Sequence, residues 1–209
     1  MPLAPSNRQL IHTRSISVHA FRRDDGLWDL EARLVDLKSR DVPLASGIRA
    51  RGMPVHDMTL CVTIDEQLVI VAAGAASDAT PYPGQCEAIT PSYERLVGLN
   101  LLRGFRGAVR ERLGGTAGCT HLTELTAVLP TAAIQAFAGE VIDTGDGAPG
   151  PADGQAARTS RPFQIDRCHA LREDGPTVRE YYPTWYRAPG TNAAPSDDPS
   201  PSVSSKEPA

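Results

Sequence analysis

The sequence predicts an α+β fold, in which an antiparallel sheet of about four strands is followed by three helices packed on one face. In the first half of the chain, apolar residues alternate with polar ones and β-branched residues are frequent, as in half-buried strands. After residue 90 the apolar residues recur every three or four positions, which is the period of a helix. A run of strands followed by a run of helices is typical of α+β domains.

Four segments have the alternation of a strand. The first two flank the turn Asp24-Asp25-Gly26, and the other two flank residues 65–67, so each pair predicts a hairpin. Together they predict a meander. Between the pairs, residues 38–54 contain two Pro, two Gly and many charges, and we expect a long loop there. The predicted strands are residues 15–23, 27–37, 55–64 and 68–75.

Three helices are expected in the second half. The first should begin at Thr90-Pro91, with Thr as the N-cap and Pro in the first helical position. The second covers residues 104–113, and the third runs from residue 120 to about 138. Pro130 should kink or break the third helix, because proline lacks the N–H that a helix interior needs.

Composition changes near the two ends and after residue 142. Residues 143–160 and 188–209 are rich in Gly, Pro and Ser, which predicts a flexible insertion and a disordered tail. The aromatic-rich segment between them is expected to fold back onto the core. The predicted organisation is an N-terminal arm (1–13), an α+β core (14–142), the insertion (143–160), a C-terminal segment packed on the core (161–187) and the tail (188–209).

Charge and hydropathy exclude several classes of function. A net charge of −4 and a pI near 5.7 argue against a nucleic-acid partner, which requires a strongly basic face. No run of 18 apolar residues is present, so no membrane span is expected, and the first residues lack the apolar stretch of a signal peptide. We therefore expect a cytoplasmic protein, whose four cysteines are thiols or metal ligands rather than disulfides.

The cysteines and histidines provide the candidate site. Three cysteines lie in turns or at predicted helix starts, where free backbone N–H groups favour the thiolate that binds metals. Cys61, on a predicted strand, is expected in the core. Thiolates joined by His or Asp can hold zinc or an iron–sulfur cluster. The predicted metal ligands are Asp78, Cys86, Cys119, His121, Cys168 and His169.

An alternative is a cysteine-dependent enzyme of small-molecule metabolism. Cys119 would be the nucleophile, with His121, His56 or His169 as its base. In a regular helix, side chains two positions apart point to opposite sides. Cys119 and His121 therefore converge only if Cys119 precedes the first helical turn. Packed thiols without chemistry, or an interaction module whose polar tails bind partners, remain open as well, and the sequence does not decide whether the protein is an enzyme.

Several blocks carry a resemblance to a known family. RRDDGLWDLEARLVD and RERLGGTAGCTHLTEL are two of them, and the chain from residue 14 to 186 resembles a bacterial family catalogued as domain of unknown function 2889. That resemblance implies no agreed activity. The order of parts is also similar to iron–sulfur scaffold proteins of the NifU type, in which three Cys with an Asp or His hold a cluster or zinc. The motif positions of the first family, domain of unknown function 2889, fall on His56, Asp57, Asp78, Cys86, Cys119, His121, Cys168 and His169.

Overall fold

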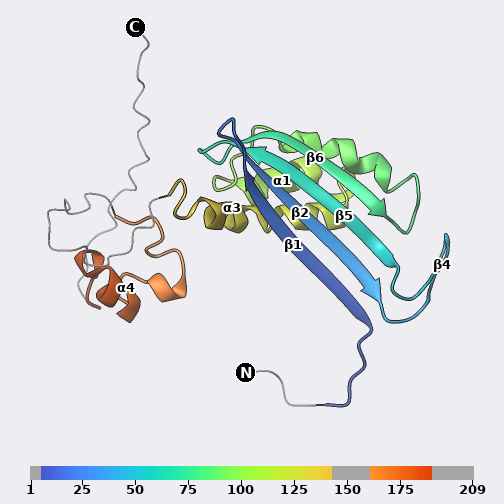
Figure 1. The fold of residues 1–209 in the computed structure, drawn as a ribbon, viewed down its shortest axis with the longest axis horizontal. Helices are drawn as coiled ribbons and strands as arrows, with labels where there is room; N and C mark the ends of the chain where they lie inside the picture. The colour runs from blue at the N-terminus through green and yellow to red at the C-terminus, as the bar shows by residue number, and fades with distance from the viewer. Residues whose placement is uncertain (1–5, 143–160, 190–209) are drawn as a thin grey trace, which may run out of the picture. The chain divides into compact units, whose positions relative to one another are not determined.

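A four-stranded antiparallel sheet is the largest element of residues 6–142. The structure, a computed structural model, describes residues 6–142 and 161–189 (Figure 1). Its chain forms two compact units, Met1–Asp143 and Thr144–Ala209. In the first unit the strands follow the order β1-β2-β5-β6, and each strand pairs with the next, so the predicted meander and α+β class are confirmed. The strands are β1 (His12–Arg22), β2 (Trp28–Lys38), β5 (Pro54–Ile64) and β6 (Ile70–Ala79).

The connection from β2 to β5 is not the plain loop that its Pro and Gly content predicts. It contains a short hairpin of β3 (Val42–Leu44) and β4 (Gly47–Arg49). Side chains hold this hairpin to the residues after β6, because Arg49 donates to the Thr80 carbonyl at 2.9 Å and Ser46 donates to the Pro81 carbonyl at 2.6 Å. The prediction was wrong because these contacts span more than thirty positions of sequence.

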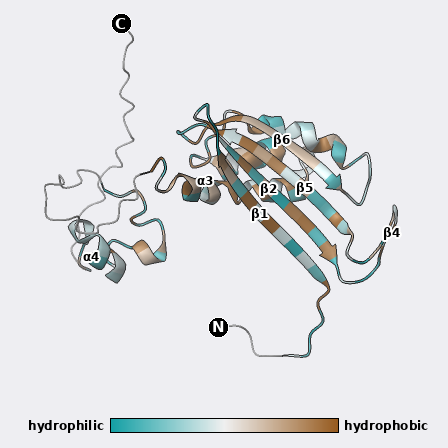
Figure 2. Cartoon of the chain, in the orientation of Figure 1, coloured by the Kyte–Doolittle hydropathy of each residue, from teal (hydrophilic) through white to brown (hydrophobic). Residues whose placement is uncertain are grey.

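The core lies between one face of the sheet and the helices. From Trp28 to Asp36 on β2 and from His56 to Ile64 on β5, even-numbered residues point into it and odd-numbered residues point to the other face, as the pleat of a strand requires. The alternation appears as bands of hydrophobic and hydrophilic residues along these strands (Figure 2). The buried members are Trp28, Leu30, Ala32 and Leu34 on β2, and Met58, Leu60, Val62 and Ile64 on β5.

The helices of this unit cover one face of the sheet (Figure 1). In order they are η1 (Glu87–Leu96), α1 (Phe105–Leu113), η2 (Gly115–Ala117), α2 (Thr120–Thr126) and α3 (Leu129–Phe137). Within residues 6–142 and 161–189, no helix combines the length and apolar character that crossing a lipid bilayer requires.

One of the three expected helices differs from its predicted form, and another is interrupted where its proline predicts. The first begins at Glu87 rather than at Thr90-Pro91, and it is a 3-10 helix with Pro91 inside. Its start is fixed by the Glu87 carboxylate, which accepts hydrogen bonds from the Gly84 N–H at 2.6 Å and the Thr80 hydroxyl at 2.9 Å. The third is interrupted, as Pro130 predicts, and this proline lies in the first turn of α3.

The second unit is small and contains short helices. Its elements are η3 (His169–Leu171), α4 (Pro176–Tyr181) and η4 (Pro183–Trp185), and two of its residues, Ile165 and Val178, are buried. The packing of residues 161–187 on the core stays a prediction. The predicted insertion (143–160) and nearly all of the predicted tail lie outside the described residues.

Candidate metal centre

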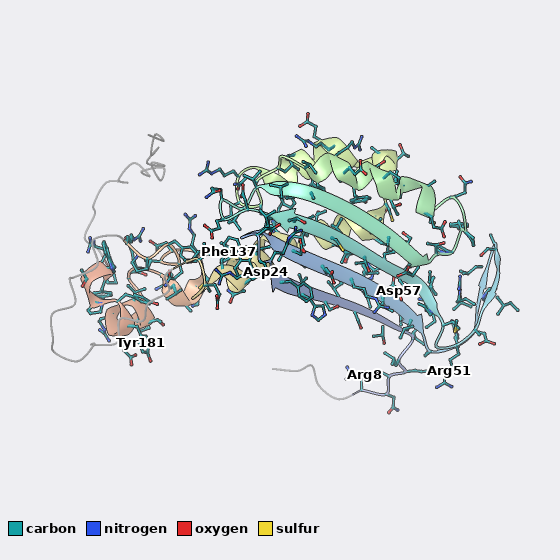
Figure 3. The ribbon with its side chains drawn as sticks, turned by 45° about the horizontal axis from the view of Figure 1, so that its top comes forward. Arg8, Asp24, Arg51, Asp57, Phe137 and Tyr181 are labelled. Carbon is teal, nitrogen blue, oxygen red and sulfur yellow. The ribbon has the colours of Figure 1, made fainter. Side chains whose placement is uncertain are left out.

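A cluster of polar side chains interrupts the apolar core face at one end of the sheet. On β2, the inward-facing positions Trp28 to Leu34 are apolar, and the next inward position is Asp36, whose side chain is only 3% exposed. His56 lies directly opposite Asp36 on β5, because the two strands pair in that register. Asp57, which follows His56, faces the other side of the sheet, and Figure 3 labels it at this end of the strand.

A third ligand-bearing side chain comes from the helix layer. His121 lies in the first turn of α2, and its ring packs against the ring of His56 with 3.7 Å between centroids and an interplanar angle of 30°. One ligand atom from each of Asp36, His56 and His121 lies within 4.8 Å of the other two. Two neighbouring strands and one helix therefore bring a carboxylate and two imidazoles together.

Asp36 is the centre of the hydrogen bonding in this cluster. Arg14 on β1 binds both of its oxygens, with Nε donating to Oδ1 at 2.8 Å and an Nη donating to Oδ2 at 2.7 Å. His56 Nδ1 lies 2.9 Å from Oδ2 and His12 Nε2 lies 3.1 Å from Oδ1. His121 Nε2 is further away, at 3.9 Å from Oδ2. These contacts fix the orientation of the carboxylate.

The formal charges around the cluster favour a cation. Arg14 also binds Glu124 of α2, with 2.6 Å between Nη1 and Oε2. One guanidinium is therefore shared between two carboxylates, those of Asp36 and Glu124. Counting these three groups alone, the cluster has a net charge of −1, which attracts a positive ion.

The pKa values of two groups suit metal binding. Burial alone would raise the pKa of Asp36, but hydrogen bonds from Arg14 and His56 lower it to about 2, so the carboxylate is ionised at neutral pH. Burial also lowers the pKa of His121, and the nearby His56 and Arg14 lower it further. An uncharged imidazole is the form that binds a metal, so His121 is in its ligating state at neutral pH.

The spacing of these atoms fits a first-row metal ion after small side-chain movements. Bonds of about 2.0–2.1 Å in a tetrahedral site place neighbouring ligand atoms about 3.3 Å apart. The distances from Asp36 Oδ2 to His56 Nδ1 and His121 Nε2 are 2.9 and 3.9 Å, on either side of that value. Opening the first contact and closing the second would admit the ion. His56 would then exchange its hydrogen bond to Asp36 for a metal bond.

Cys119 lies beside His121, in the arrangement that the sequence required for them to converge. Its backbone is extended (φ −94°, ψ 131°) and it precedes the first turn of α2. Its Sγ lies 3.9 Å from His121 Nδ1, on the nitrogen opposite the one that faces Asp36. The buried Tyr93 fixes this position, because its hydroxyl accepts from the Cys119 N–H at 3.0 Å.

Two other predicted ligands of the first unit, Cys86 and Asp78, do not join this cluster. Cys86 is half-buried before η1, and Asp78 is exposed on β6. Cys168 and His169 are exposed in the second unit, where their role as ligands stays a prediction. In the described part of the chain, no group of three closely spaced ligand atoms includes a cysteine. Of the predicted metal ligands, His121 belongs to the cluster, together with His56, which was predicted as a catalytic base.

Four residues of the cluster escaped the sequence analysis, namely His12, Arg14, Asp36 and Glu124. Asp36 lies in a predicted strand and Arg14 directly before one, but neither was singled out. The available signal was the strand period, which places Asp36 on the same face as the apolar residues before it. A charged residue at a core position demands a partner. The same period shows that the prediction for Cys61 was wrong, because this odd-numbered residue lies half-buried on the outer face.

Comparison with known proteins identifies one family to which the chain is similar. No curated protein and no solved structure matches the chain. The model of a family described as a protein of unknown function (DUF2889) matches residues 12–135, which is more than half of the chain. That range contains every member of the cluster, from His12 to Glu124. The chain therefore belongs to this family of proteins of unknown function.

Proposed function

We propose that the protein binds a divalent transition-metal ion, zinc in the first instance, through Asp36, His56 and His121. The observation that carries this proposal is the meeting of one carboxylate and two imidazoles from β2, β5 and α2, with ligand atoms within 4.8 Å of one another. These groups lie at the end of an apolar face rather than on an exposed acidic surface. Ligands held by separate rigid elements are pre-organised for binding.

Three protein ligands would leave a position for water or substrate, as in catalytic rather than structural zinc sites. A zinc-bound water ionises near neutral pH and can attack a carbonyl or phosphoryl group, and the metal can also polarise such a group. The same donor set suits non-haem iron, so metal analysis has to identify the ion. An iron–sulfur cluster is less supported, because it requires several cysteine ligands.

Two neighbours would support the three ligands without touching the metal. Arg14 would hold Asp36 in place through its two hydrogen bonds of 2.8 and 2.7 Å. Cys119 would accept a hydrogen bond from His121 Nδ1, which leaves Nε2 free for the metal. Such outer contacts typically change metal affinity by about 10–100-fold.

Calorimetric titration of the chelator-treated full-length chain tests this proposal. We expect one zinc ion per chain, and the affinity should fall by more than about 100-fold in His56→Ala and His121→Ala, beyond the effect of an outer contact. His19→Ala is the matched control, because this exposed histidine lies on β1 away from the cluster. Zinc binding that is equally tight in the wild type and in the double variant H56A/H121A would refute the site.

A second candidate function is supported by the position of Cys119. Its Sγ and the Asp36 carboxylate lie on opposite nitrogens of His121, each at 3.9 Å, which is the order of groups in a nucleophile–base–carboxylate triad. The protein would then be a cysteine-dependent enzyme of the cytoplasm, where thiols stay reduced. A single fast-reacting thiol in zinc-free protein, lost in Cys119→Ser and slowed in His121→Asn, would favour this candidate.

A further inference from the structure

Strand β1 is an edge of the sheet with no partner on its outer side. In the described part of the first unit it pairs with β2 alone, and ten of its eleven residues are exposed, Val18 being half-buried. The opposite edge is partly occupied, because the β6 residue Ile70 exchanges backbone hydrogen bonds with Gly98 and Leu99. The two edges therefore differ in how much of their backbone is available.

The pairing with β2 shows which backbone groups of β1 are free. The Ser39 N–H donates to the Ile11 carbonyl, and the Arg23 N–H donates to the Leu27 carbonyl. Odd-numbered residues thus exchange hydrogen bonds with β2, because such pairs alternate along an antiparallel ladder. The even-numbered residues point their N–H and C=O groups away from the sheet. They are His12, Arg14, Ile16, Val18, Ala20 and Arg22.

This edge has few of the features that usually prevent strands from adding to a sheet, because its inward charge Arg14 is already paired with Asp36. Exposed edges commonly contain Pro, Lys, inward charges or bulges. β1 has no Pro, Gly or Lys and keeps one register with β2 over its whole length, whereas both other ladders of the sheet contain register shifts. Two apolar side chains are exposed along it, Ile16 at 38% and Phe21 at 49%. A long regular edge with exposed apolar residues is suited to strand addition.

The charges on β1 argue against an acidic peptide as the added strand. Arg14 is already bound by Asp36 and Glu124, and Arg22 lies 3.6 Å from Glu140. Residues 15–21 contain no Asp, Glu, Lys or Arg. The middle of the edge is therefore nearly neutral, and its two ends have compensated arginines. A second copy of the strand meets no uncompensated like charge in its middle.

We propose that two copies of the chain pair antiparallel through β1, with the two-fold axis at Ser17. The ladder requires even-numbered residues to face even-numbered ones, and this register places Ile16 beside Val18 of the second copy. It also places the long Arg14 side chain beside Ala20 of the second copy. Moving the register by two residues in one direction would instead bring Arg14 opposite Arg22 of the second copy, which brings like charges together.

The pairing has a consequence for the metal centre. The two sheets would join into one sheet of eight strands, with both metal centres on the helix-covered face. His12, which contacts Asp36, would lie opposite Arg22 of the second copy. Arg22 of each copy would therefore lie at the edge of the proposed metal centre of the other copy.

A cysteine at the two-fold axis tests the register directly. Ser17 and its symmetry mate form a non-hydrogen-bonded pair, in which Cα atoms are about 4.5 Å apart and within disulfide range. Under mild oxidation, full-length Ser17→Cys should form a linked dimer of about 45 kDa, twice the chain mass of 22.3 kDa. Ser15→Cys is the matched control, because it faces His19 of the second copy, and the wild type controls for the four native thiols. Equal crosslinking of all three proteins, or none in Ser17→Cys, overturns the proposal.

Light scattering after size-exclusion chromatography measures the mass without oxidation. We expect a dimer for the wild type and a monomer for Ile16→Lys, because two buried lysines would lie near the axis. Val71→Lys, at an exposed position (42%) on the opposite edge, should stay dimeric. A monomeric wild type, or dimers in both lysine variants, contradicts pairing through β1. Circular dichroism confirms folding, and should Ile16→Lys fail to fold, the Ser17→Cys result decides.

Discussion

Asp36 shows how a single buried charge organises its surroundings. An ionised carboxylate taken out of water is costly unless it is paired and hydrogen-bonded. Here Arg14, His56 and His12 all bind it, and these three residues come from β5 and from the edge strand β1. An inward position on a strand that elsewhere buries Leu and Ala has thus become the centre of a polar cluster. A charged side chain at a position that would otherwise bury an apolar one is typical of a ligand-binding site, and we interpret Asp36 in this way.

The low pKa of Asp36 predicts acid sensitivity in the metal-free protein. Its folded-state pKa of about 2 lies below the ordinary value of 3.8, so its ionised form stabilises the folded state. This contribution, about 2 kcal/mol, is complete above about pH 5 and is lost as the pH falls towards 2. Urea unfolding at pH 5 and pH 2.5 measures it. A wild type that loses no more stability over this interval than Asp36→Asn would contradict the assignment.

Two arginine–aspartate pairs on opposite faces of the sheet allow a matched comparison. Arg14, itself 33% exposed, binds a carboxylate that is 3% exposed, whereas Arg33, itself 54% exposed, binds the Asp57 carboxylate on the outer face, which is 13% exposed. Arg14→Met should lower the free energy of unfolding by about 2 kcal/mol, because it leaves a buried charge without its main partner. Arg33→Met should lower it by less than about 1 kcal/mol. Equal losses in urea titrations would show that burial of Asp36 is not the decisive factor.

At the scale of the element, the start of helix α2 determines where Cys119 and His121 lie. Gly118 precedes it with an extended backbone, and a Cβ there would lie 2.3 Å from the Leu113 carbonyl oxygen. Glycine is therefore required by close approach. The chain can turn into α2 at this point only because residue 118 has no side chain.

This close approach makes Gly118→Ala a test of the helix start. We expect it to destabilise the fold by about 2 kcal/mol and to weaken zinc binding, because the clash with backbone must displace the first turn of α2. Gly107→Ala is the control, since a Cβ at this position in α1 meets nothing within 4 Å and alanine favours a helix. Thermal unfolding and zinc titration of both variants would show the contrast. If Gly118→Ala is destabilised but binds zinc with unchanged affinity, the position of the first turn of α2 does not determine zinc binding.

The sequence predicts the elements better than it predicts the site. Period-two alternation identifies the four long strands, because each buries one face. It also places Asp36 and His56 on the inner face. The pairing of these two residues depends on the register across a connection that contains the β3–β4 hairpin, and local pattern does not determine that register. The approach of His121 depends on how α2 packs, which is likewise not local.

At the scale of the whole molecule, the family match and the cluster coincide. The matched range, residues 12–135, begins at the first strand, contains the cluster from His12 to Glu124 and lies within the first unit. The predicted ligands Cys168 and His169 belong to the second unit. The first unit thus contains all three ligands of the proposed site, whereas the predicted cysteine-based set draws on both units. These two sets differ in the atoms that would bind the metal.

X-ray absorption at the zinc edge of the zinc-loaded full-length chain distinguishes the two sets most directly. Zinc bonds to nitrogen and oxygen are about 2.0–2.2 Å long, and zinc bonds to sulfur are about 2.3 Å. Binding through Asp36, His56 and His121 predicts a first shell of nitrogen and oxygen alone, with the outer scattering of two imidazoles, and His19→Ala should give the same spectrum. A first shell that contains sulfur, or one that is unchanged in His56→Ala, would contradict the account.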